Sequence, residues 1–296
     1  MNHPAPPPHP AQSAAAFLAE AHALLGERGL TSDPDRMDAW LTDWRGRYTG
    51  RALALAAPAS TEEVAALVKL CARHGVPIVP QGGNSGMAGG ATPDTTGSAI
   101  ILSLRRMNAI RKLTPEAGMA VCEAGVILQT LHEAAEAAHM RFPLTLGGKG
   151  SATIGGLIAT NAGGTQVLRH GTMRAQVLGL EAVLATGEVL DLMTPLKKDN
   201  RGFDLKQLLI GSEGTLGIVT AATLRPRNGV GGARRDYRGA RRSAADGARH
   251  GRCARRFRGG AHALPPIRSR PRTCGPRAAR RSASLERADR MRFVRA

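Results

Sequence analysis

The chain has 296 residues, with 41 Lys plus Arg against 23 Asp plus Glu and a formal net charge of +18. That charge is unevenly placed, because residues 1–227 carry 21 cations and 19 anions whereas residues 228–296 carry 20 and 4. Aromatic residues make up only 3 % of the chain, too few for a surface that reads single strands by base stacking. The overall charge therefore indicates no nucleic-acid partner for residues 1–227.

Cysteine usage and the N-terminus bear on compartment. The four cysteines are far apart and form no CxxC motif, so we expect no disulfide scaffold and no metal site. Residues 1–12 lack Lys and Arg, which excludes a secretory signal, and no later stretch is long enough to span a membrane. These features predict a cytoplasmic protein without a transmembrane segment.

The first predicted elements follow a flexible N-terminal dozen. Residues 17–25 have apolar side chains at helical spacing and precede Gly26, so residues 1–40 are predicted as a flexible segment with one short helix. A strand is expected at 53–57. Ser60 and Glu63 form a capping box for a helix that runs to about His74.

Strands and glycine-rich loops alternate after that helix. The expected strands are 76–80, 99–104, 109–113, 119–123, 177–184, 188–192 and 216–224, and the expected helices are 126–138 and 204–209. Because the strand at 53–57, its helix and the strand at 76–80 form one unit, we expect a parallel pair with a right-handed crossover. The mixture predicts an α+β domain at 41–227, made of subdomains at about 41–105 and 106–227.

Residues 228–296 differ in composition from everything before them. Of these 69 residues, 46 are Arg, Ala, Gly or Pro, and only five are Ile, Leu or Val. No helical or strand period is present, so the segment cannot bury enough apolar surface to offset its ordering entropy. It is predicted to be a disordered, arginine-rich tail.

Three glycine clusters suggest a ligand. Five glycines fall within residues 82–90, directly after a strand, and further clusters lie at 154–164 and 211–217. Such loops expose backbone N–H groups and let a phosphate approach the main chain, although a single loop of this kind is equally compatible with a mobile surface turn. Neither GxGxxG nor GxxxxGK followed by Ser or Thr occurs, so a dinucleotide would be held by another fold.

The segments around these glycines resemble a known family. PQGGNSGMAGG, LGGKGSATIGGLIATNAGG, VLRHGT, VLGLEAVLATGEVLDL, LKKDNRGFDLKQL and IGSEGTLGIV occur in this order. They resemble the PCMH-type FAD-binding domain of vanillyl-alcohol oxidase-type flavoproteins, in the branch of D-2-hydroxyglutarate dehydrogenase, D-lactate dehydrogenase and the glycolate oxidase flavoprotein subunit. The resemblance covers residues 41–227, LTDWRGRYTG included.

The resemblance implies a set of cofactor-binding residues. On the diphosphate side these are Pro80, Gly82, Gly83, Asn84, Ser85, Gly86 and Met87. On the flavin and ribityl side they are Gly150, Ser151, Gly155, Gly156, Thr160 and Asn161, and at the adenosine end they are Glu213, Gly217 and Ile218. Relatives that bind FAD covalently often have His where Asn84 stands, so non-covalent FAD is expected here.

Two basic residues have alternative interpretations. Lys149 could place a positive charge near the reduced flavin, or it could be solvated. His170 stands where relatives often have Tyr, and an active-site role is weighed against a structural or exposed one.

The family also implies what the chain lacks. Its reaction transfers hydride from C2 of a D-2-hydroxy acid to flavin N5 and passes electrons to an acceptor protein or quinone. The substrate domain that follows in the family carries the general base, the carboxylate clamp and a metal site, and none of its motifs occurs after Arg227. We therefore expect a truncated and inactive chain without catalytic residues, whose tail is an out-of-frame translation of a G+C-rich gene.

One competing interpretation concerns the tail. Twenty arginines on a flexible segment would hold phosphate polyanions, so the alternative is an FAD module that binds nucleic acid.

Overall fold

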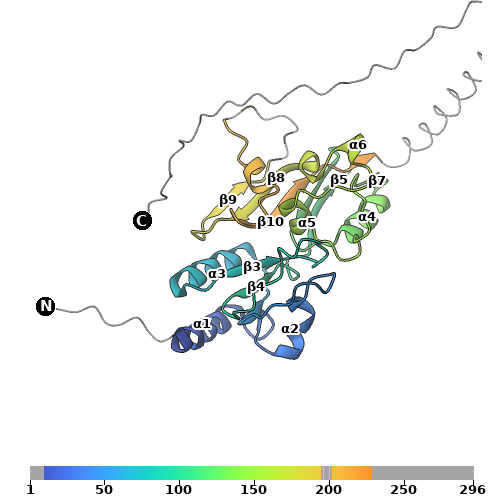
Figure 1. The fold of residues 1–296 in the computed structure, drawn as a ribbon. Helices are drawn as coiled ribbons and strands as arrows, with labels where there is room; N and C mark the ends of the chain where they lie inside the picture. The colour runs from blue at the N-terminus through green and yellow to red at the C-terminus, as the bar shows by residue number, and fades with distance from the viewer. Residues whose placement is uncertain (1–9, 195, 197–199, 201, 229–296) are drawn as a thin grey trace, which may run out of the picture. The chain divides into compact units, whose positions relative to one another are not determined.

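The computed structural model describes residues 10–194, 196, 200 and 202–228. The predicted arginine-rich tail at 228–296 lies outside this range except for Asn228, and so do residues 1–9 of the predicted flexible N-terminus and the nucleic-acid alternative. Within it the α+β class is confirmed, as a four-stranded sheet, a five-stranded sheet and a two-stranded pair with helices packed around them (Figure 1). No helix in the described part of the chain is long and apolar enough to cross a membrane.

The first sheet has the order β1-β2-β4-β3. Its strands are β1 (Leu30–Thr31), β2 (Ala54–Ala56), β3 (Ile78–Gln81) and β4 (Ile100–Ser103). Both β2 and β3 run parallel to β4, which lies between them. The predicted parallel strands are therefore present, but they are second neighbours, because β4 pairs with both from further along the chain.

Helix α3 (Thr61–His74) forms for the local reasons that the sequence gives. The hydroxyl of Ser60 accepts the N–H of Glu63, and the Glu63 carboxylate reaches back to accept the N–H of Ala59, the residue before the N-cap. Gly75 ends the helix at a φ of 66°. The predicted limits of this helix are confirmed.

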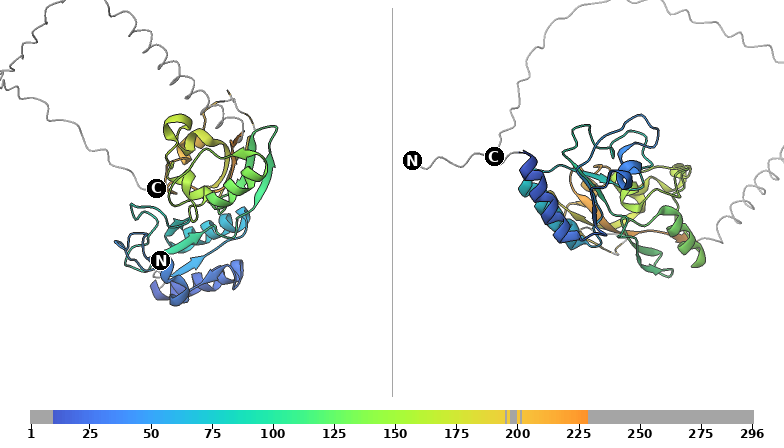
Figure 2. Two further views of the ribbon diagram at one scale, coloured as in Figure 1. Left: turned by 90° about the vertical axis from the view of Figure 1, so that its right-hand side faces the viewer. Right: turned by 90° about the horizontal axis from the view of Figure 1, so that it is seen from below.

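Residues 10–41 pack onto the first subdomain, which contains the first sheet and α3. Helix α1 (Pro10–Leu25) lies alongside α3 (Figure 2). Its Phe17 and Ala21 are fully buried. Strand β1 joins the first sheet, and α2 (Pro34–Leu41) follows it. Residues 1–40 were predicted to lie outside the domain. Amphipathic spacing indicates that one face of a helix is buried, but it does not indicate which surface of the protein covers that face.

The second sheet is antiparallel, with the order β5-β6-β10-β8-β9. Its strands are β5 (Ile110–Thr114), β6 (Met119–Glu123), β8 (Val177–Val183), β9 (Val189–Leu192) and β10 (Ile218–Leu224). Around it lie α4 (Leu128–Ala137), α6 (Val167–His170), η1 (Met173–Gln176), α7 (Lys206–Leu209) and the pair of β7 (Met140–Arg141) with β11 (Arg227–Asn228). The first sheet ends before the predicted subdomain division near residue 105 and the second begins after it; the domain limits remain a prediction.

Two helices of the second subdomain, α5 (Ile154–Ala159) and α6, were not predicted. Helix α5 contains Gly155 and Gly156, residues of low helix propensity, inside a region that the sequence marks as a loop. A Cβ at Gly155 would lie 2.7 Å from the Cβ of Ala124. Close packing against β6 therefore requires glycine, and tertiary contact outweighs local propensity.

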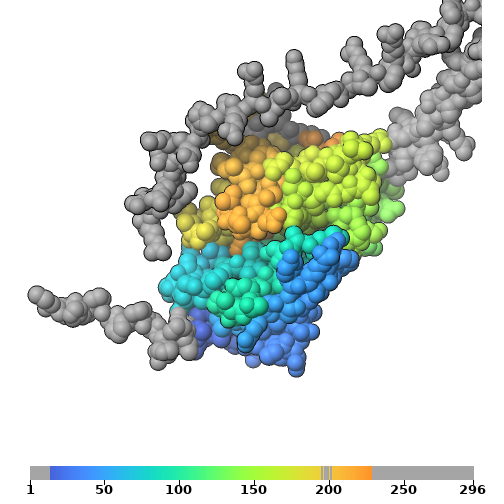
Figure 3. Space-filling model, in the orientation of Figure 1, coloured from blue at the N-terminus to red at the C-terminus, as the bar shows by residue number. Residues whose placement is uncertain are grey.

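Each subdomain has its own apolar core, and α3 lies between them. Cys71 of α3 is in the first core, which also takes in Val183 and Ile218 from the second sheet, while Cys122 is in the second core. Burial raises the pKa of both thiols to about 12. In Figure 3 the atoms of residues 10–105, blue to teal, adjoin those of the second subdomain, green to orange.

Candidate cofactor site

A cavity of about 460 Å³ is lined mainly by three segments that are far apart in sequence. They are the end of β3 with the loop that follows it, α5 with the residues on either side of it, and the loop that precedes β10 with the start of that strand. Residues 102–105, 124–125 and 146 complete the lining. Of the residues predicted to hold the cofactor, those that line the cavity are Pro80, Gly82, Gly83, Asn84, Ser85, Gly86, Met87, Gly155, Gly156, Thr160, Glu213, Gly217 and Ile218.

The loop after β3 offers a row of unused hydrogen-bond donors. The backbone N–H groups of Gly83 to Met87 donate to no atom in the described part of the chain. Gly83, Asn84 and Ser85 are half-buried and Gly86 and Met87 are exposed, so these N–H groups are open to a ligand or to solvent. Consecutive free N–H groups at the edge of a cavity fit the oxygens of a phosphate group.

Two different physical reasons explain why glycine stands at these positions of the loop. A Cβ at Gly83 would lie 1.6 Å from the carbonyl oxygen of Ser151, and one at Gly82 would lie 2.5 Å from Oγ1 of Thr153. These two glycines let the loop pack against the second subdomain. A Cβ at Gly86 would meet no protein atom within 4 Å, so packing does not explain this glycine, whereas close approach of a ligand does.

A turn at residues 43–48 supports the loop that follows β3 through hydrogen bonds. The buried carboxylate of Asp43 accepts the N–H groups of Arg45, Arg47 and Tyr48 at 3.1, 2.6 and 2.7 Å. These hydrogen bonds, that from Tyr48 foremost, lower the pKa of Asp43. The adjacent carbonyl of Thr42 then accepts the side-chain amide of Asn84 at 2.8 Å.

That contact determines the backbone at Asn84. Asn84 has a φ of 47°, a left-handed conformation that is costly for most side chains other than Gly, Asn and Asp. Because its amide nitrogen is held by the Thr42 carbonyl, the residue is fixed in this conformation inside the predicted diphosphate loop.

Arg174 holds the third segment. Its guanidinium donates to the backbone and side-chain oxygens of Gln207 and to the Ile210 carbonyl, and its backbone N–H donates to the side chain of Asn161. The N–H of Glu213 donates to the carbonyl of Ala159 at 2.9 Å. These bonds join the end of α5 to the loop before β10.

Three predicted residues do not line the cavity. Gly150 and Ser151 are exposed on the loop that packs on Gly83, and Asn161 turns its side chain to Arg174. The exposed Lys149 and the half-buried His170 also lie outside the cavity lining. Whether a residue lines the cavity does not show that it binds FAD, so all the FAD contacts remain predictions.

Sequence reasoning missed several lining residues. Gln81 is 3 % exposed and donates to the carbonyls of Trp40 and Ala91, while its Oε1 is buried without a partner in the described part of the chain. Its position directly before the glycine run was the available signal. Arg105 and Thr153 also line the cavity; Thr153 lies within a family-like segment but was not selected, and Arg105 lies in no motif.

The chemistry of the lining is that of a binding site. Among the described residues that line the cavity, only Arg105 and Glu213 carry ionisable side chains, apart from hydroxyls. A general base in the form of His, Lys, Asp or Tyr is not among them. The free N–H groups, the open face of Gly86 and the unpartnered Gln81 oxygen fit a dinucleotide such as FAD.

Comparisons with known proteins agree with this geometry. The FAD binding domain family matches residues 52–193. The chain is 47 % identical over 207 residues to the mitochondrial D-2-hydroxyglutarate dehydrogenase of Bos taurus, covering 70 % of this chain and 38 % of that protein. It is 43 % identical over 201 residues to the Arabidopsis thaliana enzyme of the same name, covering 68 % and 36 %. The chain thus spans well under half the length of the curated relatives it matches.

Solved structures show the same fold. An alkyldihydroxyacetonephosphate synthase superposes with a TM-score of 0.65 at 24 % identity, covering 76 % of this chain and 42 % of that one. The 6-hydroxy-D-nicotine oxidase of Arthrobacter nicotinovorans superposes with a TM-score of 0.59 at 25 % identity, covering 69 % and 43 %. The prediction of a two-subdomain PCMH-type fold is confirmed.

The comparisons overturn one prediction and establish another. The expectation of a cytoplasmic protein is wrong, since the relatives are named as mitochondrial. It rested on dispersed cysteines and the lack of a secretory signal, which do not distinguish one reducing compartment from another. Residues 52–193 match the FAD binding domain family, and FAD is the cofactor that this match and the dehydrogenase relatives support.

Proposed function

We propose that the chain supplies the FAD-binding part of an oxidoreductase of the D-2-hydroxyglutarate dehydrogenase type. FAD bound here would accept the hydride that C2 of a D-2-hydroxy acid gives up, and an acceptor protein or quinone would take the electrons. The observation that carries the proposal is the row of free N–H groups from Gly83 to Met87 at the edge of the cavity. The identity to named dehydrogenases supports the reaction class.

We further propose that the FAD is held without a covalent bond. Asn84 presents a carboxamide, which is not nucleophilic, and its nitrogen already donates to the carbonyl of Thr42. Acid precipitation of the yellow holoprotein should release the flavin absorbance into the supernatant. Absorbance retained in the washed pellet would contradict this proposal.

Gly86 gives a direct test of FAD binding. A methyl group at Gly86 or at Gly147 meets no protein atom within 4 Å, so neither Gly86→Ala nor Gly147→Ala should disturb the fold. Only Gly86 lines the cavity. We expect Gly86→Ala to weaken FAD binding by roughly tenfold or more, about 1.4 kcal/mol, in a flavin-fluorescence titration, and Gly147→Ala to bind like the parent chain.

Unfolding of each variant in urea shows whether the fold is intact. Equal FAD affinity of the two variants, with both folded, would exclude the loop as the diphosphate site.

A further inference from the structure

A group of arginines lies outside the lining of the FAD cavity, where β7 pairs with β11. Arg141 is directly opposite Arg227 in the antiparallel register, so their side chains emerge on the same face of the pair. Arg225 lies two residues before Arg227, and all three are half-buried. None of them lines the cavity described above.

These arginines have no acidic partner. Within the described part of the chain, Arg141, Arg225 and Arg227 form no ion pair, and the Nε atom of each is buried without a hydrogen-bond partner. Like charges directly opposite on paired strands destabilise the pair, and a buried unpaired donor adds a desolvation cost. The fold thus maintains a cationic cluster without an internal anion.

The remaining polar groups around the cluster are also fixed. The guanidinium of Arg141 lies 3.2 Å from Nε2 of His170, which must act as the acceptor because arginine can only donate. Burial, followed by the charges of Arg141, Arg169 and Arg227, lowers the pKa of His170, in agreement with a neutral ring.

Gln176 ties the two sides of the cluster together. This fully buried residue donates its side-chain amide to the carbonyl of His170 at 2.5 Å, and its own carbonyl accepts the N–H of Arg225 at 2.8 Å. The Oε1 atom of Gln176 has no partner in the described part of the chain. The end of α6 and the segment before β11 are therefore held in place, while no carboxylate in the described part of the chain pairs with the three guanidinium groups.

We propose that Arg141 and Arg227, flanked by Arg225, form a binding site for a phosphate-type oxyanion. Guanidinium groups donate several N–H bonds in a planar fork, and a tetrahedral oxyanion can accept from more than one fork at a time. The anion would supply the missing acceptors and offset the repulsion between the opposed arginines.

Inorganic phosphate is the probe for this site. In the full chain we expect phosphate to raise the thermal midpoint more than chloride at equal ionic strength. Arg141→Gln and Arg227→Gln should each weaken the phosphate response about tenfold, since each removes charge-assisted hydrogen bonds. Arg73→Gln is the matched control, because Arg73 is an exposed arginine paired with Glu20 on the surface of α3.

The arginines of residues 228–296 also attract phosphate, so a local signal is needed. The imidazole resonance of His170, assigned with a His170→Gln variant, should shift on phosphate addition in the parent chain and in Arg73→Gln, and should not shift in Arg227→Gln. In phosphate-free buffer, Arg227→Gln should be at least as stable as the parent, because it relieves repulsion. A phosphate response no larger than that of chloride, or one that survives in Arg141→Gln and Arg227→Gln, would overturn the proposal.

Discussion

At the scale of single residues, Asp43 does more for the cofactor site than its position outside the cavity suggests. Its carboxylate gathers three backbone N–H groups, and the turn that results presents the Thr42 carbonyl to Asn84. The conformation of the glycine loop thus depends on an acid that lies forty-one positions earlier in the chain.

Replacing Asp43 should therefore affect FAD affinity without removing a contact to FAD. Asp43→Asn keeps the shape but loses the charge that strengthens the three bonds. We expect a lower urea midpoint and weaker FAD binding by fluorescence titration. Asp38→Asn, on the neighbouring α2, is the control, and equal losses in both variants would contradict a special role for Asp43.

The same carboxylate has a pH dependence of known sign. Its pKa in the folded chain is below the ordinary 3.8, so its stabilising contribution is complete above that value and is lost as pH falls through the lower folded pKa. Urea midpoints of the parent and Asp43→Asn should differ at pH 7 and converge below pH 3.8. A difference that grows on acidification would show that the sign is wrong.

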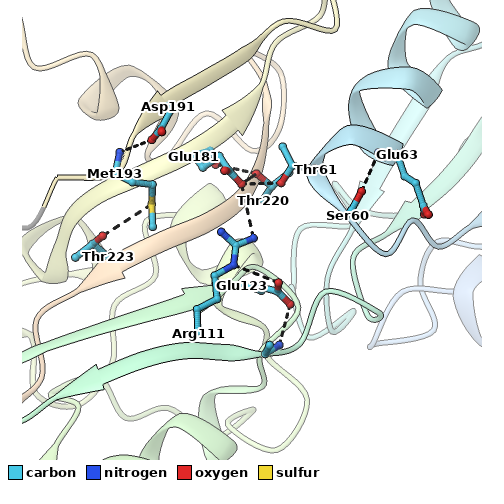
Figure 4. A network of polar contacts seen from close by, with 11 residues as sticks. Ser60, Thr61, Glu63, Arg111, Glu123, Glu181, Asp191, Met193, Thr220 and Thr223 are labelled. Atoms are coloured by element: carbon cyan, nitrogen blue, oxygen red, sulfur yellow. Dashed lines mark hydrogen bonds and ion pairs between the residues drawn. The ribbon is translucent and has the colours of Figure 1, made fainter.

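At the scale of elements, α3 connects the two subdomains through one buried hydrogen-bonded group. Figure 4 shows the Glu181 carboxylate of β8 receiving the hydroxyls of Thr61, at the start of α3, and Thr220 of β10, at 2.6 and 2.7 Å. Arg111 of β5 lies 3.9 Å from Glu181 and 3.2 Å from Glu123. The first turn of α3 is thereby fastened to the second sheet.

Thr61→Val should break this connection at nearly constant volume. It leaves a largely buried carboxylate oxygen short of one donor, a loss of about 1–3 kcal/mol in the free energy of unfolding. Thr61→Ser keeps the hydroxyl and should lose much less. Denaturant unfolding of both variants decides the matter, and equal destabilisation would assign the effect to the methyl group.

Some helices and strands could be predicted from the sequence and others could not. Helix α3 could be predicted, because its cap, its apolar face and Gly75 all lie within sixteen residues. The insertion of β4 between β2 and β3 was not, since it depends on pairing between strands that are remote in sequence. Helix α5 was missed because its glycines satisfy a packing requirement that no local pattern displays.

At the scale of the whole molecule, the described chain holds the parts of a binding site and few of those of a reaction. Glycine spacing and family resemblance predicted 13 of the 31 residues that line the cavity. They could not predict Gln81 or Arg105, because a single polar residue shows no local pattern and joins the lining only through the packing of segments that are remote in sequence.

We expect the purified chain to bind FAD but not to oxidise D-2-hydroxyglutarate or D-lactate. Apart from Glu213, the described lining contains no carboxylate, imidazole, amine or phenol that could take the proton from the substrate hydroxyl. Anaerobic reduction of bound FAD, followed by flavin absorbance, is the measurement. Bleaching by a D-2-hydroxy acid, absent with the L enantiomer, would contradict the expectation.

The two buried thiols offer a way to watch each half of the molecule separately. Cys71 lies in the first core and Cys122 in the second, and a thiol with a pKa of about 12 is inert toward alkylating reagents. Each becomes reactive only when its own core opens. The two labelling rates would therefore report the opening of each core separately. A ligand that slows both rates together must make the two subdomains open as one cooperative unit.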